Sequence, residues 1–275
     1  MKCRCNRNSE SNAFWLGVTF WALVMVVGVA FTAGAQTPEE KGRAIATEAE
    51  LRDTGWGDMS AELTMILRNR NGDERSRRMS SRALEIADDG DKTLVVFKEP
   101  RDVKGTAFLS FSHRTGDDDQ WLYLPALKRV KRIQSSNKSG PFMASEFAYE
   151  DISSQGGDKY PYKWLRDEDV GVVECFVVER YPVDEGSGYT RQVTWIDKAE
   201  YRPWKTDFYD RKESLLKTLT YSGYKQYKGK FWRPEVMEMV SHQTQKGTRI
   251  EWVGYAFGVG LNERDFDKNS LKRAR

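Results

Sequence analysis

From Met59 onward the chain alternates apolar and polar side chains in short stretches, and this pattern is the strongest constraint on its fold. The first stretch places Ala61, Leu63, Met65 and Leu67 two residues apart, with mostly polar residues between them. A period of two residues is typical of a β-strand that is buried on one face. The pattern returns through most of the chain, so the sequence predicts a mainly β protein.

Short turn sequences separate these stretches. Asn71-Gly72 favours a tight hairpin, and Asp88–Asp91, Gly116–Asp119 and Lys246-Gly247 have the composition of turns. No part of the chain has the spacing of a strand–helix–strand unit. We therefore expect successive antiparallel hairpins that form a single large curved sheet. The expected strands lie at residues 59–68, 73–87, 93–98, 105–112, 120–124, 128–134, 172–181, 189–196, 202–209, 215–227, 231–242 and 250–257.

Two segments interrupt the strand pattern. Glu39–Arg52 is predicted to be one helix, because acidic residues follow Thr37-Pro38 and an apolar stripe runs along the segment. Ser135–Gly157 is rich in serine and glycine, and long irregular segments in compact domains are often functional. Within it, Pro141–Asp151 predicts a short helical lid over the concave face, which we expect to open for a ligand. Its candidate hinges are Gly140, Gly156 and Gly157.

Residues 1–35 have the three parts of a secretory signal peptide. The start holds Lys2, Arg4 and Arg7, no charge occurs from residue 11 to 38, and the stretch ends on Ala33-Gly34-Ala35. Cleavage there would leave residues 36–275 as a single domain that acts outside the cytoplasm. The alternative is an uncleaved membrane anchor, since a run of about 20 apolar residues can span a bilayer.

Composition argues against several classes of function. The whole chain carries +3 and residues 1–35 contribute +2, so residues 36–275 carry about +1, which disfavours nucleic acid as a partner. Cys175 is the one cysteine after residue 35, and the chain has two histidines and no HExxH motif. We therefore predict no disulfide, no metal, no cofactor and no catalytic residue.

Apolar side chains are the candidate ligand contacts. Residues 36–275 hold seven tryptophans, and a large sheet with one helix and one short segment to cover it retains exposed apolar surface. Such a surface predicts a cavity for an apolar ligand, although core packing is the ordinary role of any single tryptophan. The candidate contacts are Met65, Trp121, Phe142, Met143, Phe147, Trp195, Trp204 and Trp252.

Charged residues supply a second set of candidates. Arg129, Arg132 and Glu150 are candidate polar-rim or partner contacts. The basic run at residues 128–132 also suits the edge of a sheet, where charge discourages aggregation. Glu146, Glu150 and Asp151 have the chemistry for general acid–base work, the alternative being that they face solvent.

Several motifs, taken in order, resemble a known family. They are Leu122–Ile133 with its strand–proline–strand pattern, Ser145–Asp151, and a later hairpin with Asp197-Lys198, Pro203–Lys205, Tyr209-Asp210 and Leu216-Lys217. Together they resemble the LolA-like outer-membrane lipoprotein-sorting proteins, over roughly residues 40–260.

The resemblance implies a periplasmic, unclosed β-barrel of about eleven antiparallel strands, a half-barrel with helices at its mouth. It implies a carrier that binds acyl chains of lipoproteins or lipids for transport toward the outer membrane, beside an RND-type inner-membrane transporter and without covalent chemistry. We also expect a monomer. Two alternatives are a ligand-free adaptor subunit of an RND-type transporter, and an enzyme acting on lipid or glycan through Glu146, Glu150 or Asp151.

Overall fold

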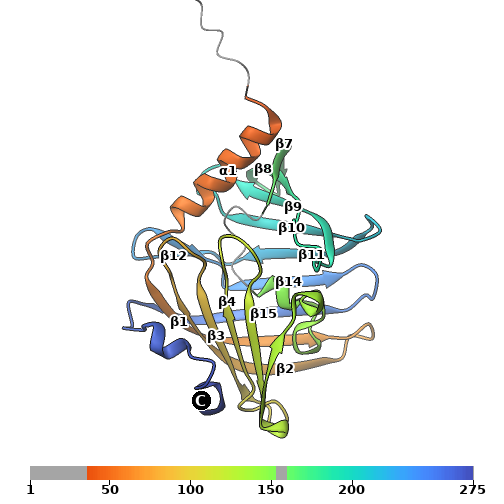
Figure 1. Ribbon diagram of the computed structural model, residues 1–275. Coiled ribbons are helices and arrows are strands. Elements are labelled where there is room, and N and C mark those ends of the chain that lie inside the picture. Colours follow the sequence, from red (N-terminus) through yellow and green to blue (C-terminus); the bar gives the residue numbers. More distant parts are fainter. Residues whose placement is uncertain (1–35, 153–159, 275) are drawn as a thin grey trace, which may run out of the picture. The chain divides into compact units, whose positions relative to one another are not determined.

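The computed structural model describes residues 36–152 and 160–274, and it is mainly β, as predicted (Figure 1). Within these ranges, thirteen strands form one antiparallel sheet that does not close, and two short strands pair separately. The strands are β1 (Asp58–Arg68), β2 (Glu74–Leu84), β3 (Lys92–Glu99), β4 (Ala107–Phe111), β5 (Asp119–Leu124), β6 (Arg129–Ile133), β7 (Tyr162–Val170), β8 (Val173–Arg180), β9 (Tyr189–Asp197), β10 (Pro203–Asp210), β11 (Leu215–Ser222), β12 (Lys225–Tyr227), β13 (Phe231–Arg233), β14 (Val236–Ser241) and β15 (Gly247–Phe257).

The first and last strands meet in the middle of the large sheet. Its order is β6-β5-β4-β3-β2-β1-β15-β14-β11-β10-β9-β8-β7, so β6 and β7 are the edges. Leu63 of β1 lies opposite Met79 of β2 on one side and Trp252 of β15 on the other. The pairing of β1 with β15 joins the two halves of the chain into one sheet. Consecutive hairpins alone would not place these two strands side by side.

The main apolar core lies on the concave face. One cluster of buried side chains combines Met65 of β1, Phe108 of β4, Phe208 of β10 and Met239 of β14. Since β4 and β10 are far apart in the strand order, a shared cluster requires a strongly curved sheet, which Figure 1 shows. The curvature brings side chains of both halves together around a common interior.

Helix α1 (Pro38–Arg52) lies across one end of the sheet, beside β7 and β8 (Figure 1). A capping box fixes its start: the Thr37 hydroxyl accepts from the Glu40 N–H at 3.1 Å, and the Glu40 carboxylate accepts from the Thr37 N–H at 2.9 Å. The predicted helix is thus confirmed to within one residue at its start. None of the helices in the described ranges is long and apolar enough to cross a membrane.

Residues 138–152, called the inner segment below, cover the concave face farther from α1. Their helical content is two 3-10 turns, Phe142–Ala144 and Tyr149–Asp151, so the predicted lid has short helical turns and no α-helix. The hinge candidates Gly156 and Gly157 lie outside the described residues.

The sequence pattern does not predict β7, and the large sheet has more strands than the resemblance implied. As an edge strand, β7 exposes the charged run Arg166–Asp169, so no alternation marks it. Two predicted strands are each divided in the structure, at Gly223, which adopts a φ of +66°, and at Pro234. These divisions create the β12–β13 hairpin, whose Arg233 pairs with Asp53 after α1.

Candidate functional site

A single glycine lets α1 approach the sheet closely. A Cβ at Gly42 would lie 2.6 Å from the backbone nitrogen of Trp164 and 2.7 Å from the backbone of Lys163, both on β7. The glycine therefore permits backbone contact that any side chain would prevent. One turn later, Ile45 is buried against Val178 and Ile196. These two residues supply the buried contact between α1 and the concave face.

Polar contacts hold the C-terminal end of α1. The guanidinium of Arg233, on β13, pairs with Asp53. The Glu85 carboxylate, after β2, accepts from the backbone N–H groups of Gly55 and Gly57 at 2.7 Å each. The chain leaving the helix is thus tied to the β12–β13 hairpin and to the segment after β2.

A cavity of about 670 Å³ lies between α1 and the sheet. Its walls come from α1, from residues 85–91 between β2 and β3, from residues 112–114 after β4, and from β8 and β9. Its volume falls in the range of ordinary small-ligand sites. Apolar walls are supplied by Ala46, Ala49, Trp56, Ile86, Val178 and Ile196.

The rim of this first cavity is acidic. Six carboxylates line it, against the guanidinium groups of Arg114 and Arg180; the acids are Glu50, Asp53, Glu85, Asp88, Asp89 and Asp91. Burial, helped by the nearby carboxylates of Glu85 and Asp53, raises the pKa of Asp91 to about 7. Arg114 pairs with Glu50 at 2.7 Å, which joins α1 to the segment after β4.

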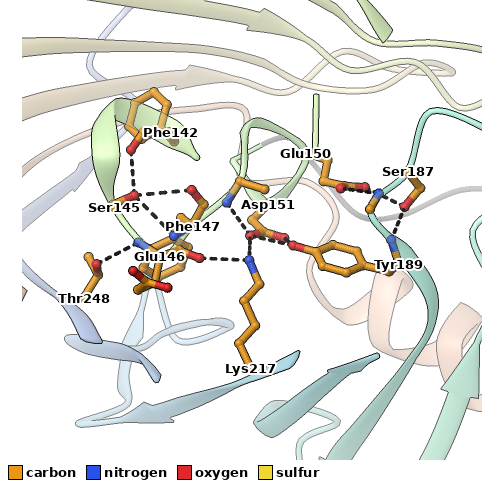
Figure 2. A network of polar contacts seen from close by, with 12 residues as sticks. Phe142, Ser145, Glu146, Phe147, Glu150, Asp151, Ser187, Tyr189, Lys217 and Thr248 are labelled. Carbon is orange, nitrogen blue, oxygen red and sulfur yellow. Dashed lines mark hydrogen bonds and ion pairs between the residues drawn. The ribbon is translucent and has the colours of Figure 1, made fainter. Parts of the chain in front are cut away.

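The inner segment is anchored by a buried polar network, shown in Figure 2. The Lys217 ammonium donates to the Asp151 carboxylate at 2.7 Å and to the Glu146 carbonyl at 2.9 Å. The Lys217 and Asp151 side chains are only 6% and 5% exposed. Tyr189 also donates to Asp151, and burial together with this carboxylate raises the pKa of the tyrosine well above its usual value.

Aromatic packing reinforces the inner segment. Phe142 and Phe147 are 1% and 2% exposed. The Phe142 ring lies 5.1 Å from Phe108 in an edge arrangement and 5.5 Å from Tyr149. The guanidinium of Arg77, on β2, donates to the carbonyl of Met143, a contact that no sequence pattern predicts. This segment therefore fills the middle of the concave face.

The predicted apolar contacts divide into two groups, and none lines the first cavity. Met65, Phe142, Met143, Phe147 and Trp252 join the concave core around the inner segment. The other three tryptophans lie outside that core. Trp121 packs with the C-terminal residues Phe266 and Leu271, and Trp195 and Trp204 pack in a cluster with Cys175 and Val177.

The strand period explains why these three tryptophans lie outside the concave core. Trp121 alternates with Leu122, which belongs to the concave core, so the two side chains leave β5 on opposite faces. A bulge between Tyr189 and Arg191 likewise reverses the faces along β9, and Trp195 leaves the sheet on the face opposite Ile196. The first cavity is lined instead by small and aliphatic residues of α1, β8 and β9, together with Trp56, Tyr162 and Tyr201.

The candidate charged residues also have definite places. Arg129 and Arg132 lie exposed on the edge strand β6, as the basic run suggested, and Arg132 pairs with Asp119. Glu150 accepts from the Ser187 hydroxyl at 2.7 Å and from the Gly188 N–H at 2.9 Å. Because Glu150 and Asp151 are engaged in holding the inner segment, their contacts are structural. No group of three His, Cys, Asp or Glu side chains in the described ranges has the geometry to hold a metal ion.

Comparison with known proteins gives consistent results. A family model described as "uncharacterized protein" matches residues 89–273. No curated protein matches the chain. The crystal structure of a domain from Vibrio parahaemolyticus, named for outer-membrane lipoprotein sorting, is 56% identical with a TM-score of 0.84, over 86% of this chain and 100% of that one. This chain belongs to the LolA-like outer-membrane lipoprotein-sorting family.

Two further crystal structures are similar to this LolA-like chain. A DUF1329 family protein from Desulfovibrio piger is 32% identical, with a TM-score of 0.81 over 86% of this chain and 99% of that one. A LolA superfamily protein from Nitrosomonas europaea is 20% identical, with a TM-score of 0.67 over 83% of this chain and 98% of that one. The latter likeness shows a shared fold, the unclosed LolA-like sheet.

Proposed function

We propose that this LolA-like protein is a periplasmic carrier that binds an acyl chain, of a lipoprotein or a lipid, in the first cavity beneath α1. The observation that carries the proposal is the cavity of about 670 Å³ with apolar walls from α1, β8 and β9. Each methylene group buried there would contribute about 0.8 kcal/mol. The lipoprotein-sorting name of the relative from Vibrio parahaemolyticus supports the same role.

The moving cover in this proposal is α1, because its buried contact with the sheet is small. Gly42 and Ile45 are its buried residues. Its further contacts are hydrogen bonds and ion pairs that water can replace, together with the Lys41 and Arg52 side chains over the rings of Trp164 and Tyr201. The lid function expected for Pro141–Asp151 stays a prediction, and the buried pair of Lys217 with Asp151 argues against it. Loading by displacement of α1 would leave the inner segment in place.

Native mass spectrometry of the protein purified from the periplasm, followed by organic extraction, tests this proposal. We expect an adduct that extracts as lipid. Ala46→Trp would place a large ring in the first cavity and should abolish the adduct. Ala44→Trp is the matched control, since Ala44 is exposed on the same helix and lines neither this cavity nor its neighbour.

The outcomes separate the carrier from the alternatives. An adduct that persists in Ala46→Trp would place the lipid elsewhere and overturn the assignment of the cavity. A bare mass, unchanged after incubation with lipids and acylated peptides, would favour the ligand-free adaptor of an RND-type transporter. Cleavage after residue 35 and a monomeric state, both predicted from the sequence, are read from the same spectra.

A further inference from the structure

A second cavity, of about 530 Å³, lies against the last turns of α1. It shares the lining residues Ala49, Asp53, Tyr201 and Pro203 with the first cavity, so the two are neighbours. We propose that this second cavity binds the anionic head of an amphiphile, a phosphate or carboxylate, while the acyl chain occupies the first. This inference rests on the proposed function, and it specifies the class of molecule carried.

The two cavities have opposite charge. Basic side chains outnumber acidic ones two to one in the second cavity, where Arg52, Arg202, Lys230 and Arg233 line the walls with Asp53 and Glu200. In the first cavity acids outnumber bases, six to two. An anionic head is therefore repelled from the first cavity and attracted to the second, which would orient an amphiphile across the boundary.

Arg202 has the geometry of a prepared anion-binding group. Its Nε donates to Asp197 at 2.7 Å, and within the described ranges its two terminal nitrogens have no hydrogen-bond partner. Asp197 is 1% exposed and also accepts from Trp204 and from the Glu200 N–H. The carboxylate thus fixes one edge of the guanidinium and leaves the edge that binds carboxylates and phosphates in a bidentate manner.

Aromatic rings flank Arg202 in the second cavity, and the acidic residues of its lining already have partners. The Arg202 guanidinium carbon lies 4.3 Å from the Trp232 ring centroid and 5.0 Å from that of Tyr224, so the group is held between faces. Asp53 is paired with Arg233, and Glu200 accepts from the Trp232 indole N–H at 3.2 Å. Both acids of the lining are engaged, and Lys230 contributes an ammonium that donates to the Thr54 carbonyl and has no carboxylate partner in the described ranges.

The test compares three probes on the purified protein by isothermal titration calorimetry. Dodecyl phosphate and dodecyl maltoside have the same alkyl chain and differ in charge, and inorganic phosphate has no chain. Below micelle-forming concentrations we expect dodecyl phosphate to bind at least about tenfold more tightly than dodecyl maltoside, a difference that one charge-assisted contact can supply. Laurate tests the carboxylate head in the same way.

Arg202→Gln should reduce the affinity for dodecyl phosphate to that for dodecyl maltoside and leave the maltoside affinity unchanged. Arg191→Gln is the matched control, because Arg191 also pairs with a carboxylate, Glu179, and lies 3.5 Å from an aromatic ring but lines neither cavity. Arg202→Gln would leave the buried Asp197 unpaired, so Lys230→Gln is the second variant. Lys230 is exposed, and we expect its substitution to weaken dodecyl phosphate binding severalfold in a folded protein.

Each outcome decides one point. Equal affinity for dodecyl phosphate and dodecyl maltoside would overturn the anion site while the carrier function stands, and binding of neither would overturn the carrier itself. Inorganic phosphate that binds as tightly as dodecyl phosphate would show a site for the free anion and overturn the assignment to an amphiphile head. Unchanged dodecyl phosphate binding in both Arg202→Gln and Lys230→Gln would place the anion elsewhere.

Discussion

The two covers of the concave face, α1 and the inner segment, are attached in different ways. The inner segment buries Phe142 and Phe147 and carries a nearly inaccessible ion pair between Asp151 and Lys217. Helix α1 buries only Gly42 and Ile45 and leaves two cavities beside it. A segment that fills its site is a permanent part of the core, whereas a helix over empty space breaks few packing contacts when it moves. This difference is why we propose that α1 moves for ligand exchange while the inner segment stays in place.

The largest expected effect comes from removing the charge that anchors the inner segment. Lys217→Met leaves the Asp151 carboxylate buried without its cation, which costs about 3–5 kcal/mol in the free energy of unfolding. Urea denaturation measures it. Lys198→Met is the control, because Lys198 pairs with Asp167 at an exposed site and should cost less than about 1 kcal/mol. A similar small loss for both variants would show that the inner segment is weakly held and restore the lid hypothesis.

The acidic rim beside α1 should make stability depend on pH. The folded pKa of Asp91, about 7, lies above the unfolded value of an aspartate, so the folded state keeps a proton that the unfolded state has lost. The free energy of unfolding therefore falls as pH rises from about 4 to 7. Asp91→Asn removes this loss and should stabilise the protein at pH 8 by on the order of 3 kcal/mol, with little change at pH 4.

Urea denaturation of wild type and Asp91→Asn at pH 4 and pH 8 gives this difference directly. Asp102→Asn is the matched control, because Asp102 is an exposed carboxylate after β3 that does not line the first cavity. Equal stabilisation by Asp91→Asn at pH 4 and pH 8 would contradict the assignment of the proton to Asp91. Glu85 and Asp53, the other carboxylates of this cluster, and Arg233, which pairs with Asp53, remain in both proteins.

The close approach of α1 to β7 should make Gly42→Ala destabilising, although alanine favours a helix. A Cβ at 2.6 Å from the β7 backbone cannot be accommodated without displacing α1, at a cost of about 1–3 kcal/mol. Without that contact, alanine would stabilise the helix by about 1 kcal/mol, so the sign of the change is diagnostic. Gly247→Ala, with its nearest neighbour at 3.5 Å, should be tolerated. Thermal denaturation and lipid binding are the measurements, and a stabilised Gly42→Ala would contradict the packing of α1.

The sequence predicts the sheet far better than it predicts the cavity. Alternation marks strands whose two faces differ, such as β1, but gives no signal for β7, which exposes charges on both faces. Most of the aromatic side chains that the sequence analysis proposed as ligand contacts pack in the core around Phe142 or in the convex cluster around Trp195. The cavity walls include Ala46, Ala49 and Ile196, and nothing in the pattern of these residues shows that space is left beside them. Empty space depends on how α1 meets the sheet.

The smallest expected effect tests whether the concave core beside the inner segment ever takes a ligand. Trp252 belongs to this core, and its buried indole N–H is the single buried side-chain polar atom in the described ranges that lacks a hydrogen-bond partner. Trp252→Phe removes an unsatisfied donor, so its cost should be lower, by about 1 kcal/mol, than that of Trp204→Phe, whose N–H donates to Asp197 at 3.0 Å. If the inner segment is permanent, lipid binding by Trp252→Phe equals that of wild type in the same mass spectra. Weaker binding would indicate that the Trp252 N–H donates to a ligand oxygen. The inner segment would then have to move for ligand binding, and the distinction between a permanent inner segment and a mobile α1 would be wrong.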